Sequence, residues 1–174
     1  MTSEALQPPA VAALLRSAAS LIHAEMSALP APALGFHPAA GEWCAKEVVG
    51  HLIECEKRGF SGRIRVIMQA EASPELEGWD QDAVARARKD CEREWTALYD
   101  EFSRLRTASV AQVAGLSPAD LSRRGLHPKV GVLTVADLLH EWVHHDRNHI
   151  RQMLANVQAF AWPHMGNARR FSAP

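Results

Sequence analysis

The sequence TVADLLHEWVHHDRNHIRQMLANVQAF, residues 134–160, carries the strongest structural pattern in the chain. Its apolar residues recur at spacings of three and four, which is the period of an amphipathic α-helix. Thr134 and Asp137 at its start are typical of an N-terminal cap. His145 and His149 fall on the apolar stripe, and their spacing of four places both imidazoles on one helix face, one turn apart. We therefore predict a long core helix that presents two imidazoles inward.

A pair of imidazoles four residues apart is typical of metal sites, because neutral imidazole binds Zn, Ni, Fe and Cu. A site needs at least a third ligand, and His51 is the strongest candidate. It lies beside Leu52 and Cys55 on the apolar side of another stretch with helical period. A single inward histidine is more often a hydrogen-bonded core residue, but a facing pair favours ligation. We predict that His51, His145 and His149 bind a divalent metal and leave coordination positions open.

The rest of the chain supplies enough helices to surround such a site. The main helices are expected over residues 9–29, 45–70, 82–113 and 134–160, within a single domain covering 1–174. The segment SRRGLHPKVGVL, residues 122–133, has no helical period and is expected to be an extended crossing loop. These elements predict an all-α four-helix bundle with a crossover connection. In such bundles, metal sites are assembled from inward side chains of facing helices.

Composition excludes several classes of partner and fold. The chain has 174 residues with 19 Lys and Arg against 20 Asp and Glu, so its net charge of −1 gives no reason to expect a nucleic acid or a membrane surface as partner. Three cysteines without a Cys-x-x-Cys spacing argue against a disulfide framework and fit a reducing compartment. No apolar run approaches a membrane span and no signal peptide is evident. We expect a cytoplasmic protein.

Two segments also resemble a known family. GEWCAKEVVGHLIECEKR, residues 41–58, and LTVADLLHEWVHHDRNHIRQM, residues 133–153, are similar to the two signature helices of the DinB/YfiT-like superfamily. The family pattern is a Gly-His-Leu histidine on the second helix and His-x-x-x-His on the last, which fall here on His51, His145 and His149. Cys44 departs from the serine that commonly caps the second helix.

The resemblance implies a four-helix bundle with a crossed connection, a divalent metal on the three histidines, and frequent homodimerisation. Zn or Ni is the expected cofactor, with Fe or Cu as alternatives. Relatives include thiol-dependent S-transferases and a mycothiol-dependent isomerase, so a small-molecule substrate and a low-molecular-weight thiol are the expected partners. Fold and metal transfer more safely than reaction.

The other histidines offer alternatives to this site. His140 and His144 form a rival pair with the same spacing on the adjacent helix face. His37 lies in a proline-rich connector and is expected to be exposed without function. The remaining histidines have no partner at ligand spacing; they are His23, His127 and His164.

Four residues near the predicted ligands have two interpretations each. Cys55 lies one turn from His51 and is either a fourth ligand or, as we favour, a small buried apolar residue. Trp142 either lines a substrate pocket or, more commonly, packs in the core. Asp146 and Glu141 are candidates to orient the ligand imidazoles, although Glu141 is more simply a solvated charge.

Two functions of different class fit this sequence. The first is a metal-dependent enzyme, a thiol S-transferase or a hydrolase, in which the open metal position binds water or a thiol. The second is a non-catalytic bundle whose metal stabilises the structure or senses stress. Three core histidines without metal are a third interpretation.

Overall fold

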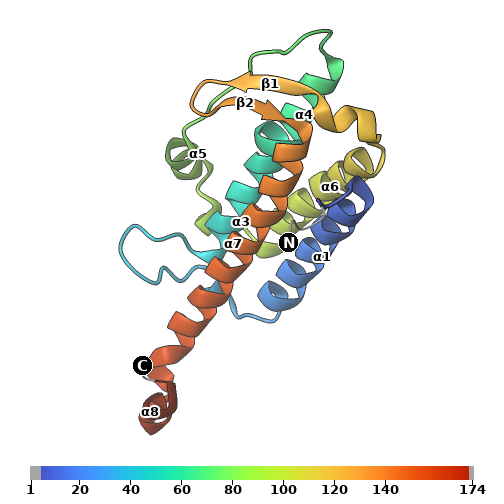
Figure 1. Cartoon of the computed structure of the whole chain (residues 1–174). Coiled ribbons are helices and arrows are strands. Elements are labelled where there is room, and N and C mark those ends of the chain that lie inside the picture. The colour runs from blue at the N-terminus through green and yellow to red at the C-terminus, as the bar shows by residue number, and fades with distance from the viewer. Residues whose placement is uncertain (1–4, 173–174) are drawn as a thin grey trace.

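The computed structural model describes residues 5–172, and four long helical segments form its body (Figure 1). The first is α1 (Pro8–Ser27), the third is α6 (Trp95–Ala114) and the fourth is α7 (Val135–Ala161). The second comprises α3 (Ala45–Glu54), the π-helical turn η1 (Cys55–Gly59) and α4 (Phe60–Gln69). The short elements are α2 (Ala31–Leu34), α5 (Gln81–Arg88), the 3₁₀ turns η2 (Asp90–Glu92), η3 (Pro118–Ser122), η4 (Trp162–His164) and η5 (Gly166–Ala168), and α8 (Arg169–Ser172).

The helices are connected in a crossed order. Helix α1 packs against α6 and α7, and α3 packs against the same two helices. Consecutive long helices α1 and α3 therefore occupy opposite corners of the bundle, as do α6 and α7. The predicted all-α four-helix bundle with a crossover connection is confirmed. Within the described part of the chain, no helix has the length and apolar character needed to cross a membrane.

The second long segment contains a wide turn that its sequence pattern did not predict. The helix expected over residues 45–70 is nearly matched in extent, but Cys55–Gly59 winds as a π-helix between two α-helical halves. Such single-turn insertions frequently lie at functional sites. Here the turn separates His51 on α3 from Phe60 and Arg63 on α4.

The third long segment is broken, so the prediction of one helix over residues 82–113 is wrong. Lys89 adopts a left-handed backbone conformation with φ 52° and ends α5. Asp90 then turns inward, where it is 1% exposed and accepts hydrogen bonds from Arg88 and Arg93. Helical period alone does not reveal this break, because a buried ion pair between neighbouring residues and not local propensity causes it.

A disulfide joins Cys91 in this break to Cys44 at the start of α3. The expectation that the cysteines form no disulfide is therefore wrong for this pair. Their separation of 47 residues gave no local signal. The inward turn at Asp90 brings Cys91 to the end of α3, and only Cys55 remains free.

Residues 122–133 form more than the expected loop. They contain the end of η3 and most of an antiparallel hairpin, β1 (Arg124–His127) paired with β2 (Gly131–Thr134). Strand β2 leads directly into α7. The predicted cap is present: the Asp137 N–H donates to Thr134 Oγ1 at 3.0 Å, and Asp137 Oδ2 accepts from the Thr134 N–H at 2.9 Å. The cap and the hairpin together fix where α7 begins.

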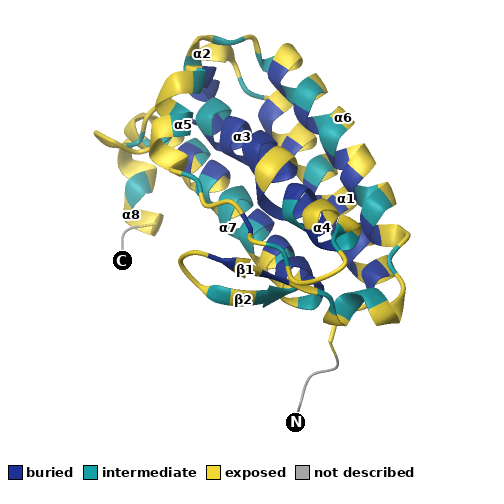
Figure 2. Cartoon of the chain, turned by 90° about the horizontal axis from the view of Figure 1, so that it is seen from above, coloured by how far each residue is buried: buried dark blue, intermediate teal, exposed yellow. Residues whose placement is uncertain are grey.

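Buried side chains line the facing sides of the long helices and form two clusters (Figure 2). One contains Trp142 and Phe60, and the other contains Phe102 and Met153. Arg106 joins them, since its guanidinium lies 4.9 Å from the Phe102 ring and 5.6 Å from the Trp142 ring. The candidate site lies where α3 and α7 meet between these clusters and the hairpin.

Candidate metal centre

Three imidazoles meet between α3 and α7. One nitrogen from each of His51, His145 and His149 lies within 4.8 Å of the other two. The Nε2 atoms of His51 and His145 are 3.0 Å apart. Nitrogens bound at about 2.1 Å to one ion are separated by roughly 3.0–3.4 Å, so this spacing fits a shared metal. The structure thus brings the three residues together, and their role as ligands stays a prediction.

Neighbouring side chains orient and enclose these rings. His149 Nδ1 lies 2.8 Å from Gln152 Oε1, which fixes the proton on Nδ1 and leaves Nε2 free. Trp43 and Trp79 flank His51, with ring centroids 5.1 and 5.7 Å from it. In the described chain, the Nδ1 atoms of His51 and His145 are buried without a hydrogen-bond partner. Their Nε2 atoms are therefore the groups that converge.

Burial keeps the imidazoles neutral. It lowers the pKa of His51 to about 3, and nearby His149 adds to the effect. Burial also lowers the pKa of His145 to about 3, with His149 and His51 contributing. The pKa of His149 is lowered as well, mainly by burial. At neutral pH all three rings present lone pairs, which is the state a metal requires.

Cys55 lies beside the same atoms. Its Sγ is 3.4 Å from His51 Nε2 and 3.8 Å from His145 Nε2. Burial raises the pKa of the thiol, and Glu56 and Asp146 raise it further. The metal-free protein therefore holds a neutral thiol here. This geometry fits both interpretations of Cys55, since a buried side chain one turn from His51 is close enough to approach a shared ion.

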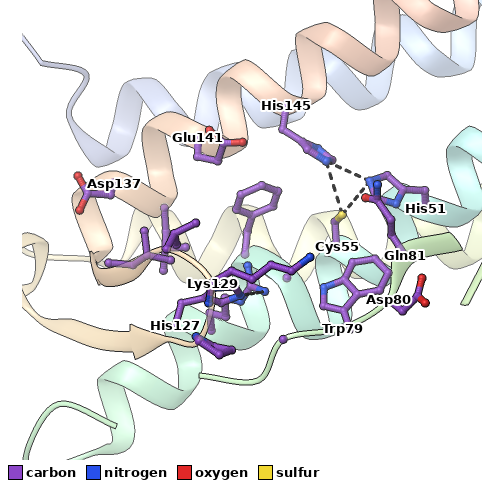
Figure 3. Close-up of a pocket in the computed structure, with 18 of the residues that line it drawn as sticks. His51, Cys55, Trp79, Asp80, Gln81, His127, Lys129, Asp137, Glu141 and His145 are labelled. Atoms are coloured by element: carbon purple, nitrogen blue, oxygen red, sulfur yellow. Dashed lines mark hydrogen bonds between the residues drawn. The ribbon is translucent and has the colours of Figure 1, made fainter. Parts of the chain in front are cut away.

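The imidazoles open onto a pocket of about 1160 Å³ (Figure 3). His51, His145 and Cys55 form one end of it. Figure 3 shows Asp137 and Glu141 reaching it from α7, and Lys129 and His127 reaching it from the hairpin and the turn that joins its strands. The pocket thus combines the imidazole cluster with acidic and cationic walls, and it is large enough for a small molecule.

Sequence reasoning missed Arg63, Trp79 and His127 as pocket residues. The three come together because the segment after α4 folds back against the hairpin, with backbone hydrogen bonds between Leu76 and Leu126 in one direction and from Leu126 to Pro74 in the other. Arg63 donates to His127 Nε2 at 3.1 Å and to the Glu77 carbonyl oxygen at 3.2 Å. An isolated tryptophan in a loop was the one available signal.

The expectation that Asp146 orients an imidazole is wrong. Its carboxylate is fully buried and accepts two hydrogen bonds from Arg106, one of them to Oδ1 at 3.1 Å. Arg106 also donates to Glu56 Oε1 at 2.6 Å. Sequence reasoning missed Arg106, although its place four residues after Phe102 on an otherwise uncharged stripe was a usable signal.

The remaining alternatives are resolved by position. The rival histidines do not converge: His140 Nε2 accepts from the Leu6 N–H, and His144 Nε2 contacts the Asn148 side chain. Trp142 is a fully buried core residue stacked on Phe60. Glu141 is exposed at the pocket wall.

Comparisons with known proteins agree with this architecture. The structure is similar to YfiT from Bacillus subtilis, described as a probable metal-dependent hydrolase with an unusual four-helix bundle topology, with a TM-score of 0.81 and 16% sequence identity over 93% of this chain and 94% of that chain. At that identity the likeness shows the fold alone. A comparison with curated proteins gave no match. The family model of the DinB superfamily matches residues 14–153, including all three histidines, and the chain therefore belongs to the DinB superfamily.

Proposed function

We propose that this protein is a divalent-metal-dependent enzyme that acts on a small molecule, of the hydrolase or thiol S-transferase type. One observation carries the proposal: three neutral, converging imidazoles form one end of an open pocket of about 1160 Å³. A purely structural metal needs no such pocket, because structural sites are closed by protein ligands. The neighbouring protein described as a probable metal-dependent hydrolase is consistent with the first of the two reaction types.

A Zn or Ni ion bound by the three histidines would supply Lewis acidity and lower the pKa of a bound water or thiol. The protein's own residues arrange the site for that chemistry. Gln152 holds the tautomer of His149. Trp43, Trp79 and Phe60 cover the imidazoles with aromatic surface, which excludes water from their sides.

The cationic wall indicates where a substrate binds. Arg63 lines the pocket, and its Nε is buried without a partner among the described residues. Lys129 lies on the same wall. A carboxylate or similar anionic group of the substrate satisfies both, and it places the reacting atom toward the imidazoles at the end of the pocket.

The test combines metal analysis with activity panels. Protein loaded with one equivalent of Zn or Ni is assayed with carboxylic esters and amides for hydrolysis, and with a low-molecular-weight thiol plus electrophiles for transfer. His149→Ala should lower turnover roughly a hundredfold or more, since it removes a ligand and not only its support. His144→Ala, an exposed histidine on the same helix, is the matched control and should leave turnover unchanged. Turnover that survives His149→Ala contradicts the proposal.

A metal that only stabilises the bundle is the second candidate, and the position of Cys55 favours it. Its sulfur is close enough to two imidazoles to complete a four-ligand, closed site. In that case Cys55→Ala should weaken metal binding strongly, and no substrate in either panel should turn over. In the enzyme, Cys55→Ala keeps the metal and the activity.

A further inference from the structure

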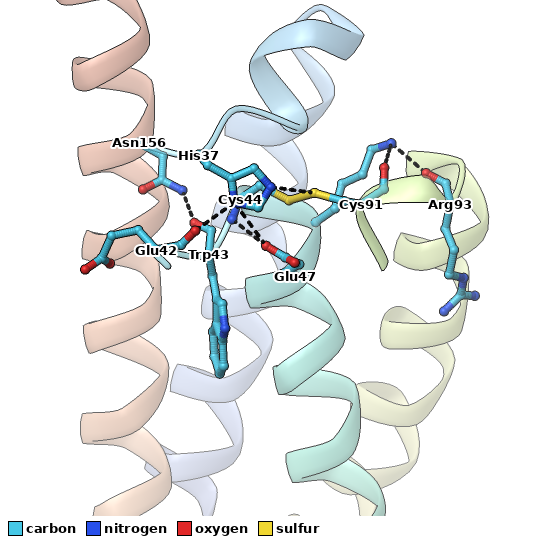
Figure 4. The surroundings of a disulfide bond; sticks show 9 residues. His37, Glu42, Trp43, Cys44, Glu47, Cys91, Arg93 and Asn156 are labelled. Carbon is cyan, nitrogen blue, oxygen red and sulfur yellow. Dashed lines mark hydrogen bonds and ion pairs between the residues drawn. A yellow bond between two sulfur atoms is a disulfide. The ribbon is translucent and has the colours of Figure 1, made fainter. Parts of the chain in front are cut away.

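A second cluster of metal-ligating side chains lies at the N-terminal end of α3, apart from the three central histidines (Figure 4). It contains Cys44 and Glu47 from the start of α3, His37 from the preceding connector, and Cys91 from η2. One ligand atom of each residue lies within 4.8 Å of the others. Two sulfurs, one imidazole and one carboxylate are a donor set that suits zinc.

The His37 imidazole is already set as a ligand. Its Nδ1 donates to the Glu42 carbonyl oxygen at 2.7 Å, which places the proton there and leaves the Nε2 lone pair free. Nε2 faces Cys91 Sγ at 3.4 Å. A sulfur and a nitrogen bound to one tetrahedral zinc are about 3.5 Å apart, so this spacing needs little change.

The two cysteines stay close to each other without the bond between their sulfurs. Lys46 Nζ donates to the Cys91 carbonyl oxygen at 3.2 Å and to the Arg93 carbonyl oxygen at 2.6 Å, which ties η2 to α3. Asp90 packs directly on Gly50, where any Cβ would overlap its carboxylate. These contacts hold Cys91 beside Cys44 in the reduced protein as well.

The start of α3 favours the reduced, anionic sulfurs. Cys44 is the residue that precedes the first turn of this ten-residue helix, where free backbone N–H groups and the helix dipole stabilise negative charge. Glu47 Oε2 accepts the Cys44 N–H at 2.8 Å, so its carboxylate is fixed at the cluster. Cys44 is buried and His37 is exposed, so the cluster has one protein side and one solvent side.

We propose that reduced Cys44 and Cys91, with His37 and Glu47, bind one zinc ion, and that oxidation to the disulfide releases it. A low-molecular-weight disulfide is the oxidant. The two thiolates lose two electrons, the sulfur–sulfur bond between Cys44 and Cys91 forms, and both metal–sulfur bonds break. The oxidant takes up the two electrons and two protons from solvent and leaves as two thiols. Excess thiol reverses the step and restores the site.

The test counts metal in the two redox states. In a Cys55→Ala background, which removes the sulfur near the central histidines, the reduced protein should bind two equivalents of zinc and the oxidised protein one. Adding Cys91→Ser should leave one equivalent in both states. Equal zinc content of the reduced and oxidised proteins overturns the proposal.

Cobalt identifies the ligands independently of the central histidines. The double variant His145→Ala with His149→Ala, reduced and freed of reductant, should bind one equivalent of Co²⁺ with thiolate-to-cobalt charge-transfer absorption. His37→Ala should weaken this binding by at least about tenfold, and a low-molecular-weight disulfide should abolish the absorption. Reduced protein without that absorption contradicts the proposal, whereas the proposed enzyme is unaffected by this result.

Discussion

Each central histidine is held by different neighbours, and His149 has the best-defined support. Gln152 Oε1 accepts its Nδ1 proton at 2.8 Å. Gln152→Ala should therefore lower metal affinity about 10- to 100-fold, because the ring loses its fixed tautomer and orientation. Competition with a chromogenic chelator measures this change. Gln158→Ala, an exposed glutamine on the same helix, should have no effect. An unchanged affinity in Gln152→Ala means that packing alone orients His149.

The buried His51 also makes the metal-free protein sensitive to acid. Its pKa is lowered from 6.5 to about 3, mainly by burial. Below pH 6.5 the unfolded chain binds a proton that the folded chain does not, so the free energy of unfolding falls as pH falls toward 3. At about 1.4 kcal/mol per pH unit, His51 contributes a loss of about 2 kcal/mol between pH 6.5 and 5.

Denaturant unfolding of the metal-free protein at several pH values measures this loss. His51→Gln should reduce the loss by about 2 kcal/mol, because glutamine does not titrate. His144→Gln serves as the control and should keep the wild-type pH dependence. The same pH dependence in wild type and His51→Gln would show that the ring is protonated equally in both states.

At the scale of elements, Arg106 connects three helical segments. Its guanidinium, 2% exposed, binds Glu56 on η1 and Asp146 on α7 from its own position on α6. Arg106→Leu leaves two buried carboxylates without a partner, and it should lower the free energy of unfolding by about 3–5 kcal/mol. Arg104→Leu changes an exposed arginine on the same helix and should cost far less. Comparable losses in the two variants would show that the buried pairing does not stabilise the fold.

Sequence reasoning predicted the elements whose cause is local. The period and cap of residues 134–160 gave α7 nearly to the residue, and the histidine spacing brought the candidate ligands onto one face. It failed where distant residues decide the backbone. The inward Asp90 broke the third helix, and the return of the segment before Leu76 onto the hairpin created the pocket wall. Neither depends on a pattern that a short window of sequence contains.

At the scale of the whole molecule, a metal bound by His51, His145 and His149 joins α3 to α7. An ion at a thousand times its dissociation constant stabilises the folded state by about 4 kcal/mol. For a chain of this size that raises the unfolding temperature by roughly 8–16 °C. Calorimetry with and without a chelator measures the difference. It should vanish in His51→Ala and persist in His144→Ala; persistence in both variants would place the stabilising ion elsewhere.

The π-helical turn at Cys55–Gly59 has a consequence for how this helix tolerates changes in length. Deleting one residue there would restore regular α-helical winding and rotate everything after it by about 100° relative to His51. Phe60 would leave its place against His145, and Arg63 would leave the pocket wall, although neither residue had been substituted. A relative lacking that residue would keep its three histidines and still bind a differently shaped substrate.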